Sequence, residues 1–462
     1  MVEHADELKA LRELETLLNA AIPSFRWSSQ VNLKLERIQS LVELLGNPQT
    51  SYPAIHIGGT SGKGTVAAMT ASILSHHGRR TGLHLSPYVQ TLTETWQLDG
   101  RYSLPSRILP VARLVTETAK NIPLMPASGP VSYFELNVAI ALELFAEERV
   151  DTAIIEVGLG GARDATNVIS ADVAVLTNVG LDHTEVLGDT VEKIAAEKVG
   201  IFKPGSIIVS GVEQLSVKAI AREKAAQVGA RLLILDDDIV LDSTARELVI
   251  KYDERQLKVD VPAAWPSFQR RNAALAIVAA CLSDPSLSPT ALSRGIEAIH
   301  LPGRFERFEE SQRTIVLDGA HNPAKVRSVI SGLDREFPGN PCTGVVALKE
   351  DKDARAILSE LSPLCSTLVL TTFNTELWQA TSPTDLAALL QALNYEGNII
   401  VEPDPSAAIE TAIGEAPAGG VVLVVGSLYL AGNIRPRWVA QLDDILHGAS
   451  FQISEQGRLR RA

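Results

Sequence analysis

"AIHIGGTSGKGTVAAMTASILSHHG", residues 54–78, decides the fold of this chain. The apolar run 54–57 predicts a buried strand, and residues 63–77 predict a helix that ends at Gly78. The turn between them is rich in glycine. A strand, a glycine turn and a helix N-terminus together direct backbone N–H groups at a phosphate, and the helix dipole favours the anion. The stretch therefore predicts a nucleotide site on an α/β fold.

The end of this turn departs from the common phosphate-loop pattern. That pattern closes with Gly-Lys-Ser/Thr, whereas here Gly62 and Lys63 are followed by Gly64, and the hydroxyl comes one place later, at Thr65. We predict that Lys63 contacts the β- and γ-phosphates and that Thr65 reaches Mg²⁺. The alternative is a tight turn with a chance lysine. A lysine and a threonine together at the helix start favour the nucleotide site.

The alternation of strand and helix continues on both sides of this stretch. Short apolar runs between helical stretches predict a mainly parallel sheet that helices cover on both faces. The predicted strands are residues 54–59, 81–86, 151–158, 172–179, 206–211 and 231–236. Residues 247–262 alternate in two short runs and predict an appended antiparallel hairpin, and residues 273–282 then predict a buried helix.

A second set of strands follows residue 310. Its members are residues 313–320, 342–349, 366–373, 398–403 and 419–427. Residues 299–310 contain Pro302 and Gly303 and lack an apolar period, which is typical of a linker. We therefore predict an α/β protein with an N-terminal P-loop-type ATPase domain in residues 1–298 and a smaller, Rossmann-like C-terminal α/β domain in residues 311–462.

Composition narrows the class of protein. The 462 residues are 45% hydrophobic and 21% charged, which is typical of a globular chain of two or three domains. The net charge of −13 argues against nucleic acid or an anionic membrane as a partner. The three cysteines lack metal-ligand spacing, and residues 1–20 predict an amphipathic helix rather than a signal sequence. We expect a cytoplasmic monomer without a membrane span, with a frayed tail at residues 454–462.

Two polar residues follow predicted strands of the first sheet. Glu156 ends the run TAIIE, and His183 lies in the loop after the next strand. Open α/β sheets bind ligands at the carboxyl ends of their strands, so both side chains are within reach of the phosphate site. A lone His183 is more typical of a satisfied loop histidine. Beside Glu156 and a phosphate loop it becomes a candidate Mg²⁺ ligand, although Mg²⁺ more often takes oxygen ligands.

Lys198 breaks the apolar pattern of its helix. Val191, Ile194 and Ile201 form one stripe, and Lys198 falls on it. An ammonium group that faces a core is costly. One interpretation is that the side chain extends past the helix end near Pro204 to reach water. The other is that Lys198 is chemically altered or bound to an opposite charge.

Seven motifs, in order, resemble those of the folylpolyglutamate synthase / dihydrofolate synthase family of Mur-type ligases. They are GTSGKGT, LSPY, EVGLGGARDATN, NVGLDHTEVLGDT, EKVGIFKPG, LPGRFERF and LDGAHNP. The resemblance extends from about Leu33 to Leu430 and covers both predicted domains. The family's phosphate loop has the form Gly-Thr-x-Gly-Lys-x-Ser/Thr, which accounts for the displaced hydroxyl of Thr65.

The resemblance implies a set of site residues. The expected ATP contacts are Gly62, Lys63, Gly64, Thr65, Asn272, Arg304 and Asp318. The expected Mg²⁺ ligands are Ser86, Glu156, His183 and Lys198, with Lys198 carried as a carbamate made with CO₂. The expected substrate contacts are Ser132, Phe134, Asp164, His321 and Ser427, while Lys352 and Asp353 match positions that close over the site. The residues expected to act in catalysis are Lys63, His183, Lys198 and Arg304.

The function that the resemblance implies is an ATP- and Mg²⁺-dependent amide ligase. It would join glutamate to a folate or dihydropteroate acceptor through an acyl phosphate, with Lys63 and Mg²⁺ neutralising charge during phosphoryl transfer. One alternative is a Mur-type ligase for a different carboxylate acceptor or amino acid. A nucleotide-sugar peptide acceptor is disfavoured, because the phosphate loop begins by residue 58. The other alternative, a nucleotide-binding regulatory protein, leaves LDGAHNP and the second domain unexplained.

The chain departs from the family where basic residues are common. Tyr88 replaces a histidine, Thr91, Thr95 and Gln97 stand where arginines are common, and Ala162 takes the place of another arginine, with Arg163 one position later. The segment NTELWQA, residues 374–380, also has no arginine. We interpret these positions as one rim of the acceptor pocket. The rim would then hold few cations for a polyglutamate tail, so we expect a short or less anionic acceptor.

Overall fold

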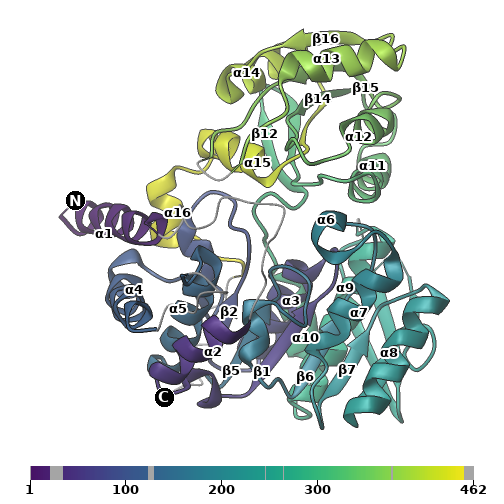
Figure 1. The fold of residues 1–462 in the computed structure, drawn as a ribbon. Helices are drawn as coiled ribbons and strands as arrows, with labels where there is room; N and C mark the ends of the chain where they lie inside the picture. Colours follow the sequence, from purple (N-terminus) through teal and green to yellow (C-terminus); the bar gives the residue numbers. More distant parts are fainter. Residues whose placement is uncertain are drawn as a thin grey trace.

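The computed structural model describes residues 2–20, 35–122, 130–244, 246–263, 265–375 and 378–451. The tail expected to fray, residues 454–462, lies outside these ranges. The chain forms two α/β lobes, with residues up to about 300 in the lower lobe of Figure 1 and most of the later residues in the upper lobe. The predicted α/β class is confirmed, with a mainly parallel sheet in each lobe.

The sheet of the lower lobe has eight strands, of which six are parallel. In spatial order they are β4 (Arg101–Tyr102), β3 (Trp96–Leu98), β2 (Thr81–His84), β5 (Thr152–Glu156), β1 (Ala54–Gly58), β6 (Val173–Leu176), β7 (Ile207–Ser210) and β8 (Arg231–Ile234). The edge strands β3 and β4 run antiparallel. β1 lies between β5 and β6, so the glycine turn that follows it emerges at the centre of the sheet.

Helices cover both faces of this sheet, as its uniformly buried strands require. One face packs on α3 (Lys63–His76), α9 (Ser267–Ser283) and α10 (Pro289–Glu297). The other packs on α1 (Val2–Asn19), α2 (Leu35–Leu44), α4 (Pro105–Lys120) and α5 (Tyr133–Glu147), and beyond them on α7 (Val191–Lys198) and α8 (Leu215–Val228). The short α6 (Thr184–Leu187) lies at the top of the lower lobe in Figure 1.

The expected hairpin is part of a separate three-stranded antiparallel sheet. The pair β10 (Glu247–Tyr252) and β11 (Arg255–Asp260) matches the prediction, and β9 (Val240–Ser243) adds a third strand beside β10. Alternate residues of β10 are buried, with Leu248, Ile250 and Tyr252 in the core against α9. The small sheet therefore caps one helix-covered face of the large one.

The upper lobe contains a six-stranded sheet, parallel except at one edge. Its spatial order is β12 (Glu306–Glu310), β13 (Arg313–Leu317), β17 (Val421–Val425), β14 (Cys342–Val346), β15 (Cys365–Leu370) and β16 (Asn398–Val401). Its helices are α11 (Pro323–Glu336), α12 (Ala354–Leu361), α13 (Pro383–Ala392), α14 (Pro405–Glu415) and α15 (Leu428–Ile434). Because β12 already pairs with β13, we propose that the linker between the lobes is confined to residues 299–305.

The chain returns to the lower lobe after α15. Helix α16 (Gln441–His447) contacts β4, the Tyr102 N–H donates to the carbonyl of Gly448 at 3.0 Å, and Phe451 pairs with Ile299. Figure 1 shows α16 beside the lower lobe, apart from the other helices of the C-terminal half. Two passes of the chain, residues 299–305 and the segment after α15, therefore connect the lobes.

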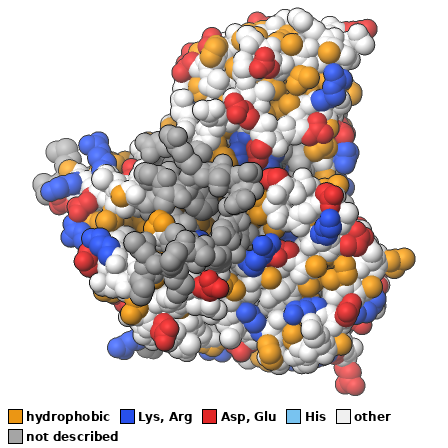
Figure 2. Space-filling model, viewed as in Figure 1, with side chains coloured by type: hydrophobic (Ala, Val, Ile, Leu, Met, Phe, Trp, Pro, Cys, Tyr) orange, Lys and Arg blue, Asp and Glu red, His pale blue; other side chains and the backbone are white. Residues whose placement is uncertain are grey.

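The surface in Figure 2 mixes charges of both signs. Blue and red side chains are interspersed over the described part of this face on both lobes. The described residues of this face therefore form no extended basic surface of the kind that nucleic-acid binding uses. Within the described ranges, no helix combines the length and the apolar character that crossing a bilayer requires.

Candidate active site

The glycine turn after β1 forms a loop that only small residues fit. Gly62 is the N-cap of α3 and has a φ of 78°, and a Cβ there would lie 2.7 Å from Oδ1 of Asn272. Asn272, on α9, is thus packed directly against the loop. Lys63 is the first residue of α3, and Thr65 is buried two positions later. The start of a helix directs its backbone N–H groups at an anion, and in this turn the Gly64 N–H donates to the carboxylate of Glu156.

The loop is held from the side by the segment after β6. The Ser61 N–H donates to Oδ1 of Asn178 at 2.9 Å, and the Thr177 hydroxyl donates to the carbonyl of Ser61 at 2.7 Å. The Thr60 N–H also donates to the carbonyl of Asn178. Asn178 was not among the residues singled out from the sequence. Its position directly after a buried strand beside the phosphate loop is the signal that points to it.

Glu156 lies beside the phosphate loop at the end of β5. Its Oε2 accepts the Ser86 N–H at 2.9 Å, and a Cβ on Gly64 would lie 3.3 Å from the same oxygen. Burial raises the pKa of Glu156, and the nearby Lys63 ammonium opposes this rise. A carboxylate in this setting is stabilised by bound cations, which fits the chemistry of a metal ligand.

Ser86 and His183 each present a buried atom, Oγ and Nδ1, that has no hydrogen bond to a described residue, although His183 Nδ1 lies 3.7 Å from Glu185. His183 is the N-cap of α6 with a φ of 51°, and burial lowers its pKa to about 4, so the imidazole is neutral near pH 7. A hydroxyl, a carboxylate and a neutral imidazole fit a divalent cation. Among the described residues, no group of three His, Cys, Asp or Glu side chains forms such a site alone.

Lys198 is buried at the end of α7, as the apolar stripe predicted. Its side chain is almost fully enclosed, and Nζ donates to the carbonyl of Gly59 in the phosphate loop at 2.9 Å. Burial, and then the charge of Lys63, lowers the pKa of Lys198 to about 7. The interpretation in which the side chain extends past Pro204 to water is therefore wrong: the amine points into the site.

The upper lobe presents an acid and a histidine at the junction, and the linker adds an arginine. Asp318 follows β13 and accepts the N–H groups of Phe305 and Ala320, both at 2.8 Å. Burial raises the pKa of Asp318 and the charge of Arg304 opposes this. Arg304 is exposed, its Nη1 would lie 3.3 Å from a Cβ on Gly319, and its charge opposes the rise in the pKa of Glu156 in the other lobe. His321 lies three residues after Asp318, and its Nδ1 is 2.8 Å from the carbonyl of Gly319.

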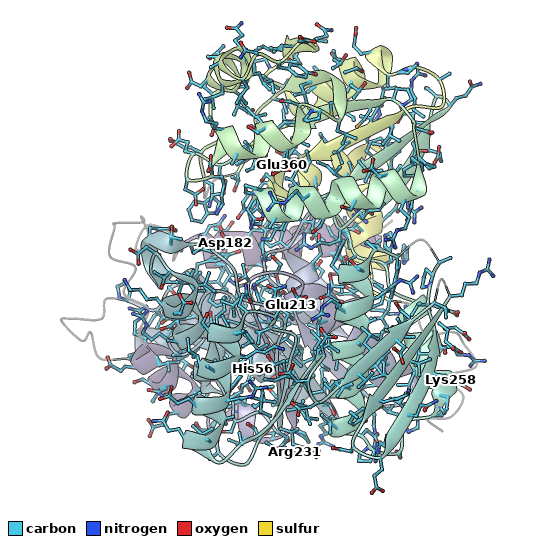
Figure 3. All side chains as sticks on the ribbon, turned by 90° about the vertical axis from the view of Figure 1, so that its right-hand side faces the viewer. His56, Asp182, Glu213, Arg231, Lys258 and Glu360 are labelled. Carbon is cyan, nitrogen blue, oxygen red and sulfur yellow. The ribbon has the colours of Figure 1, made fainter. Side chains whose placement is uncertain are left out.

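Asp182 gathers cations from the upper lobe, although the sequence motifs did not single it out. Its carboxylate is 3.5 Å from Nζ of both Lys325 and Lys352 and 3.9 Å from Nε2 of His321. Burial acts to raise its pKa, but the charge of Lys325 and the neighbouring His183, His321 and Lys352 outweigh burial and hold the pKa of Asp182 below its usual range. Figure 3 shows Asp182 at the top of the lower lobe, facing the upper one.

Several expected substrate residues also have local structural roles. Ser132 caps α5, Ser427 caps α15 and Asp353 caps α12, each by accepting a backbone N–H. Asp164 is buried and accepts the Leu159 N–H at 2.7 Å, which shapes the GLGG turn after β5. The ring of Phe134 lies against Gly158 in the same turn, where a Cβ would be 2.3 Å away. The structure thus brings Phe134 and Asp164 to one turn beside Glu156.

The prediction that residues 91–97 form an exposed, cation-poor rim of the acceptor pocket is wrong. Thr91, Thr95 and Gln97 are buried rather than exposed at a pocket edge. The cause is the buried Glu94, whose carboxylate accepts the N–H groups of Val89, Gln90 and Thr91 and folds the loop inward.

The other positions that depart from the family pattern, at residues 162–163 and 88, have different surroundings. Ala162 packs against Gly200, where a Cβ would be 2.3 Å away, and Arg163 is paired with Glu197 at 3.2 Å. Tyr88, which takes the place of a histidine, is half-buried. In NTELWQA, residues 376–377 lie outside the described ranges.

Comparisons with known proteins bear on both lobes. The Mur ligase middle domain matches residues 57–280, and the Mur ligase glutamate ligase domain matches residues 303–428. A dihydrofolate synthase/folylpolyglutamate synthase of Mycobacterium tuberculosis is 32% identical over 398 residues, which are 80% of each chain. The chain belongs to the dihydrofolate synthase/folylpolyglutamate synthase family.

Solved structures of this family share the whole fold. The Mycobacterium tuberculosis folylpolyglutamate synthase complexed with ADP superposes with a TM-score of 0.82 at 30% identity, covering 93% of this chain and 98% of that one. A bifunctional folylpolyglutamate synthase/dihydrofolate synthase with Mn, AMPPNP and L-glutamate bound gives a TM-score of 0.76 at 29% identity, covering 87% and 93%. The chain is thus an ATP-dependent glutamate ligase of the folylpolyglutamate/dihydrofolate synthase type.

Proposed function

We propose that this enzyme joins glutamate to a folate or dihydropteroate acceptor through an acyl phosphate, using ATP and Mg²⁺. The observation that carries the proposal is the junction of the lobes. The phosphate loop with Lys63 and Glu156 opens there, opposite Asp318 and His321 of the upper lobe. The relatives with ADP, or with Mn, AMPPNP and L-glutamate, support the same reading.

The lower lobe would hold the ATP phosphates. Backbone N–H groups of residues 62–65 and the Lys63 ammonium would bind them, with Asn272 fixing the loop from α9. Ser86, Glu156 and His183 would hold Mg²⁺, because they offer a buried carboxylate and two buried atoms that make no hydrogen bond in the part of the chain that the structure describes. When bound, the metal supplies positive charge against the transferred phosphoryl group.

Lys198 would carry a carbamate. Carbamate formation needs a neutral amine, and a pKa of about 7 makes that form available near neutral pH. The amine nitrogen attacks the carbon of CO₂, loses one proton and keeps one N–H. That N–H can still donate to the carbonyl of Gly59, the present partner of Nζ. The product is an anion beside the phosphate loop, which changes a costly buried cation into a group that attracts Mg²⁺.

The upper lobe would complete the reaction. A carboxylate does not form an amide with an amine in water, because it is a poor electrophile. Transfer of the γ-phosphoryl group makes an acyl phosphate, the amino group of glutamate attacks its carbonyl carbon, and phosphate leaves. Arg304, whose charge already acts on Glu156, would stabilise the transferred group, and His321 and Ser427 would contact the amino acid. Closure of the lobes would keep water from hydrolysing the acyl phosphate.

The acceptor would be short or weakly anionic. Beside the GLGG turn, Ala162 carries no charge and Arg163 is already paired with Glu197. A polyglutamate tail would therefore meet few free cations on this side of the site. Dihydropteroate or a monoglutamate fits this setting better than a long tail.

The test measures kcat/KM for dihydropteroate and for acceptors with one, two and three glutamates. Phosphate release in the presence of Mg-ATP and glutamate is the readout. The proposal expects the highest value with dihydropteroate or a monoglutamate. A steady rise with glutamate number would contradict the short acceptor. Phosphate release that needs no acceptor would contradict the ligase reaction itself.

A further inference from the structure

Lys325 reaches from the upper lobe to the junction, yet no motif of the sequence points to it. It lies in the first turn of α11, where its N–H donates to the side chain of the N-cap Asn322 at 2.9 Å. Its Nζ is 2.9 Å from Nε2 of His321 and 3.5 Å from Oδ2 of Asp182 in the other lobe. Lys325 thus contacts a residue of each lobe with one ammonium group.

These contacts fix the proton of His321. The carbonyl of Gly319 can only accept a hydrogen bond, so Nδ1 of His321, 2.8 Å away, carries the proton. Nε2 of the neutral ring then has a lone pair, which accepts from the Lys325 ammonium. The ring is neutral because burial, and then the charge of Lys325, lowers the pKa of His321 well below its ordinary value.

We propose that Lys325 is a positioning residue for the ligase reaction, which holds His321 in the Nδ1–H tautomer and, through Asp182, ties that tautomer to the approach of the two lobes. The inference rests on the proposed role of His321 at the amino-acid site. If the lobes separate, Lys325 loses the Asp182 carboxylate, and the geometry at Nε2 is no longer fixed from both sides.

Lys352 does not duplicate this role. It shares Asp182 with Lys325, at 3.5 Å from Oδ1, but its other ionic partner is Asp351 of its own lobe. His321 Nε2 itself lies 3.9 Å from Asp182, but among the described residues it is Lys325 that is at hydrogen-bond distance from Nε2 and also pairs with Asp182. The two lysines therefore have different roles. Lys352 adds attraction between the lobes, whereas Lys325 also donates to Nε2 of His321 and so keeps the ring proton on Nδ1.

The test compares Lys325→Met and Lys325→Arg with Arg327→Met. The methionine removes the donor and keeps the length of the side chain, and the arginine keeps a donor. Arg327 is the matched control, because it lies on the same helix but pairs with Glu360 on the surface, away from the junction. Ring ¹⁵N NMR spectra, with His321→Gln to assign the signal, report the tautomer without any turnover.

We expect the wild type and Lys325→Arg to show His321 protonated at Nδ1, and Lys325→Met to show a mixture of tautomers. We also expect Lys325→Met to raise the KM for the amino acid about tenfold while the KM for ATP stays unchanged. Arg327→Met changes neither quantity.

A Lys325→Met protein with the wild-type tautomer, or with the kinetics of Arg327→Met, would overturn the proposal. The failure of the proposed function is a separate result. A wild-type chain without ligase activity refutes that function, and the tautomer spectra still decide the role of Lys325.

Discussion

Single residues at the junction differ in how far their role follows from the sequence. The burial of Lys198 was predictable, because the apolar stripe of its helix already indicated it and the structure confirms it. Its carbamate remains a prediction. Asp182 and Lys325 are 143 positions apart and share no local pattern, so only the tertiary structure brings them together. Asp182 lies in the motif NVGLDHTEVLGDT, but only its neighbour His183 was predicted to be a site residue.

Lys63→Ala tests the phosphate loop. The alanine removes the charge expected to offset that of the transferred phosphoryl group, so we expect acceptor-dependent phosphate release to fall by about 10²–10³-fold. The stability should change little, because Lys63 lies at a helix start with its side chain in the site. Lys193→Ala is the control, since it removes an exposed lysine paired with Asp189. Turnover of Lys63→Ala close to the wild-type value would refute the nucleotide site.

The pH dependence of stability tests the burial of Lys198. With a pKa of about 7 in the folded protein and an ordinary value of 10.5 when unfolded, Lys198 binds more protons in the unfolded state between these limits. Its contribution to the free energy of unfolding therefore rises from pH 7 to about 10, by up to about 1.4 kcal/mol per pH unit. Denaturation of the wild type and Lys198→Met in CO₂-free buffers gives this contribution as a difference. A difference that is flat with pH would show that Lys198 is not desolvated.

Whole elements were predicted better than the loops between them. The strands β1, β2, β5 and β6 follow from apolar runs, because a strand buried on both faces has no polar alternation to obscure it. The segment 88–97 was misplaced as an exposed rim. Its burial depends on the carboxylate of Glu94 accepting three N–H groups, an arrangement that residue types alone do not reveal. The third strand of the small sheet, β9, was missed because only one of its four residues is even partly buried.

Ser132 and Ser288 form a matched pair of helix caps. Each hydroxyl accepts the N–H of the third residue of its helix, at 3.3 Å in α5 and 3.2 Å in α10. We expect Ser132→Ala and Ser288→Ala each to lower the free energy of unfolding by about 1 kcal/mol. Only Ser132→Ala should raise the KM for the acceptor, since only Ser132 is an expected substrate contact. If both variants keep the wild-type KM, the cap is the whole role of Ser132.

At the scale of the molecule, the lobes are joined by a buried ionic cluster as well as by the chain. Arg435 donates to Glu306 at 2.9 Å, to Asp444 at 3.0 Å and to Gln90 at 2.8 Å. These partners come from β12, α16 and the lower lobe. The two-lobe organisation was predictable from the restart of the strand pattern. The return of the chain after α15 was not, because no motif indicates where α16 packs.

Arg435→Met tests this cluster against an exposed counterpart. Removing the arginine leaves two buried carboxylates without their cation, so we expect the free energy of unfolding to fall by about 3–5 kcal/mol. Arg437→Met should cost about 1 kcal/mol or less, because its partners Glu310 and Glu410 are more exposed. Denaturant titration measures both. Equal losses would show that Arg435 does not bind the lobes together.

The fate of one oxygen atom tests the acyl-phosphate reaction across the two lobes most directly. The acceptor carboxylate is labelled with oxygen-18 and incubated with the enzyme, Mg-ATP and glutamate, and the released phosphate is analysed by mass spectrometry. Phosphoryl transfer to that carboxylate, followed by attack of the amino group, moves one labelled oxygen into the phosphate. Labelled phosphate is expected in equal amount to the amide product. Amide product accompanied by unlabelled phosphate would contradict the acyl-phosphate reaction.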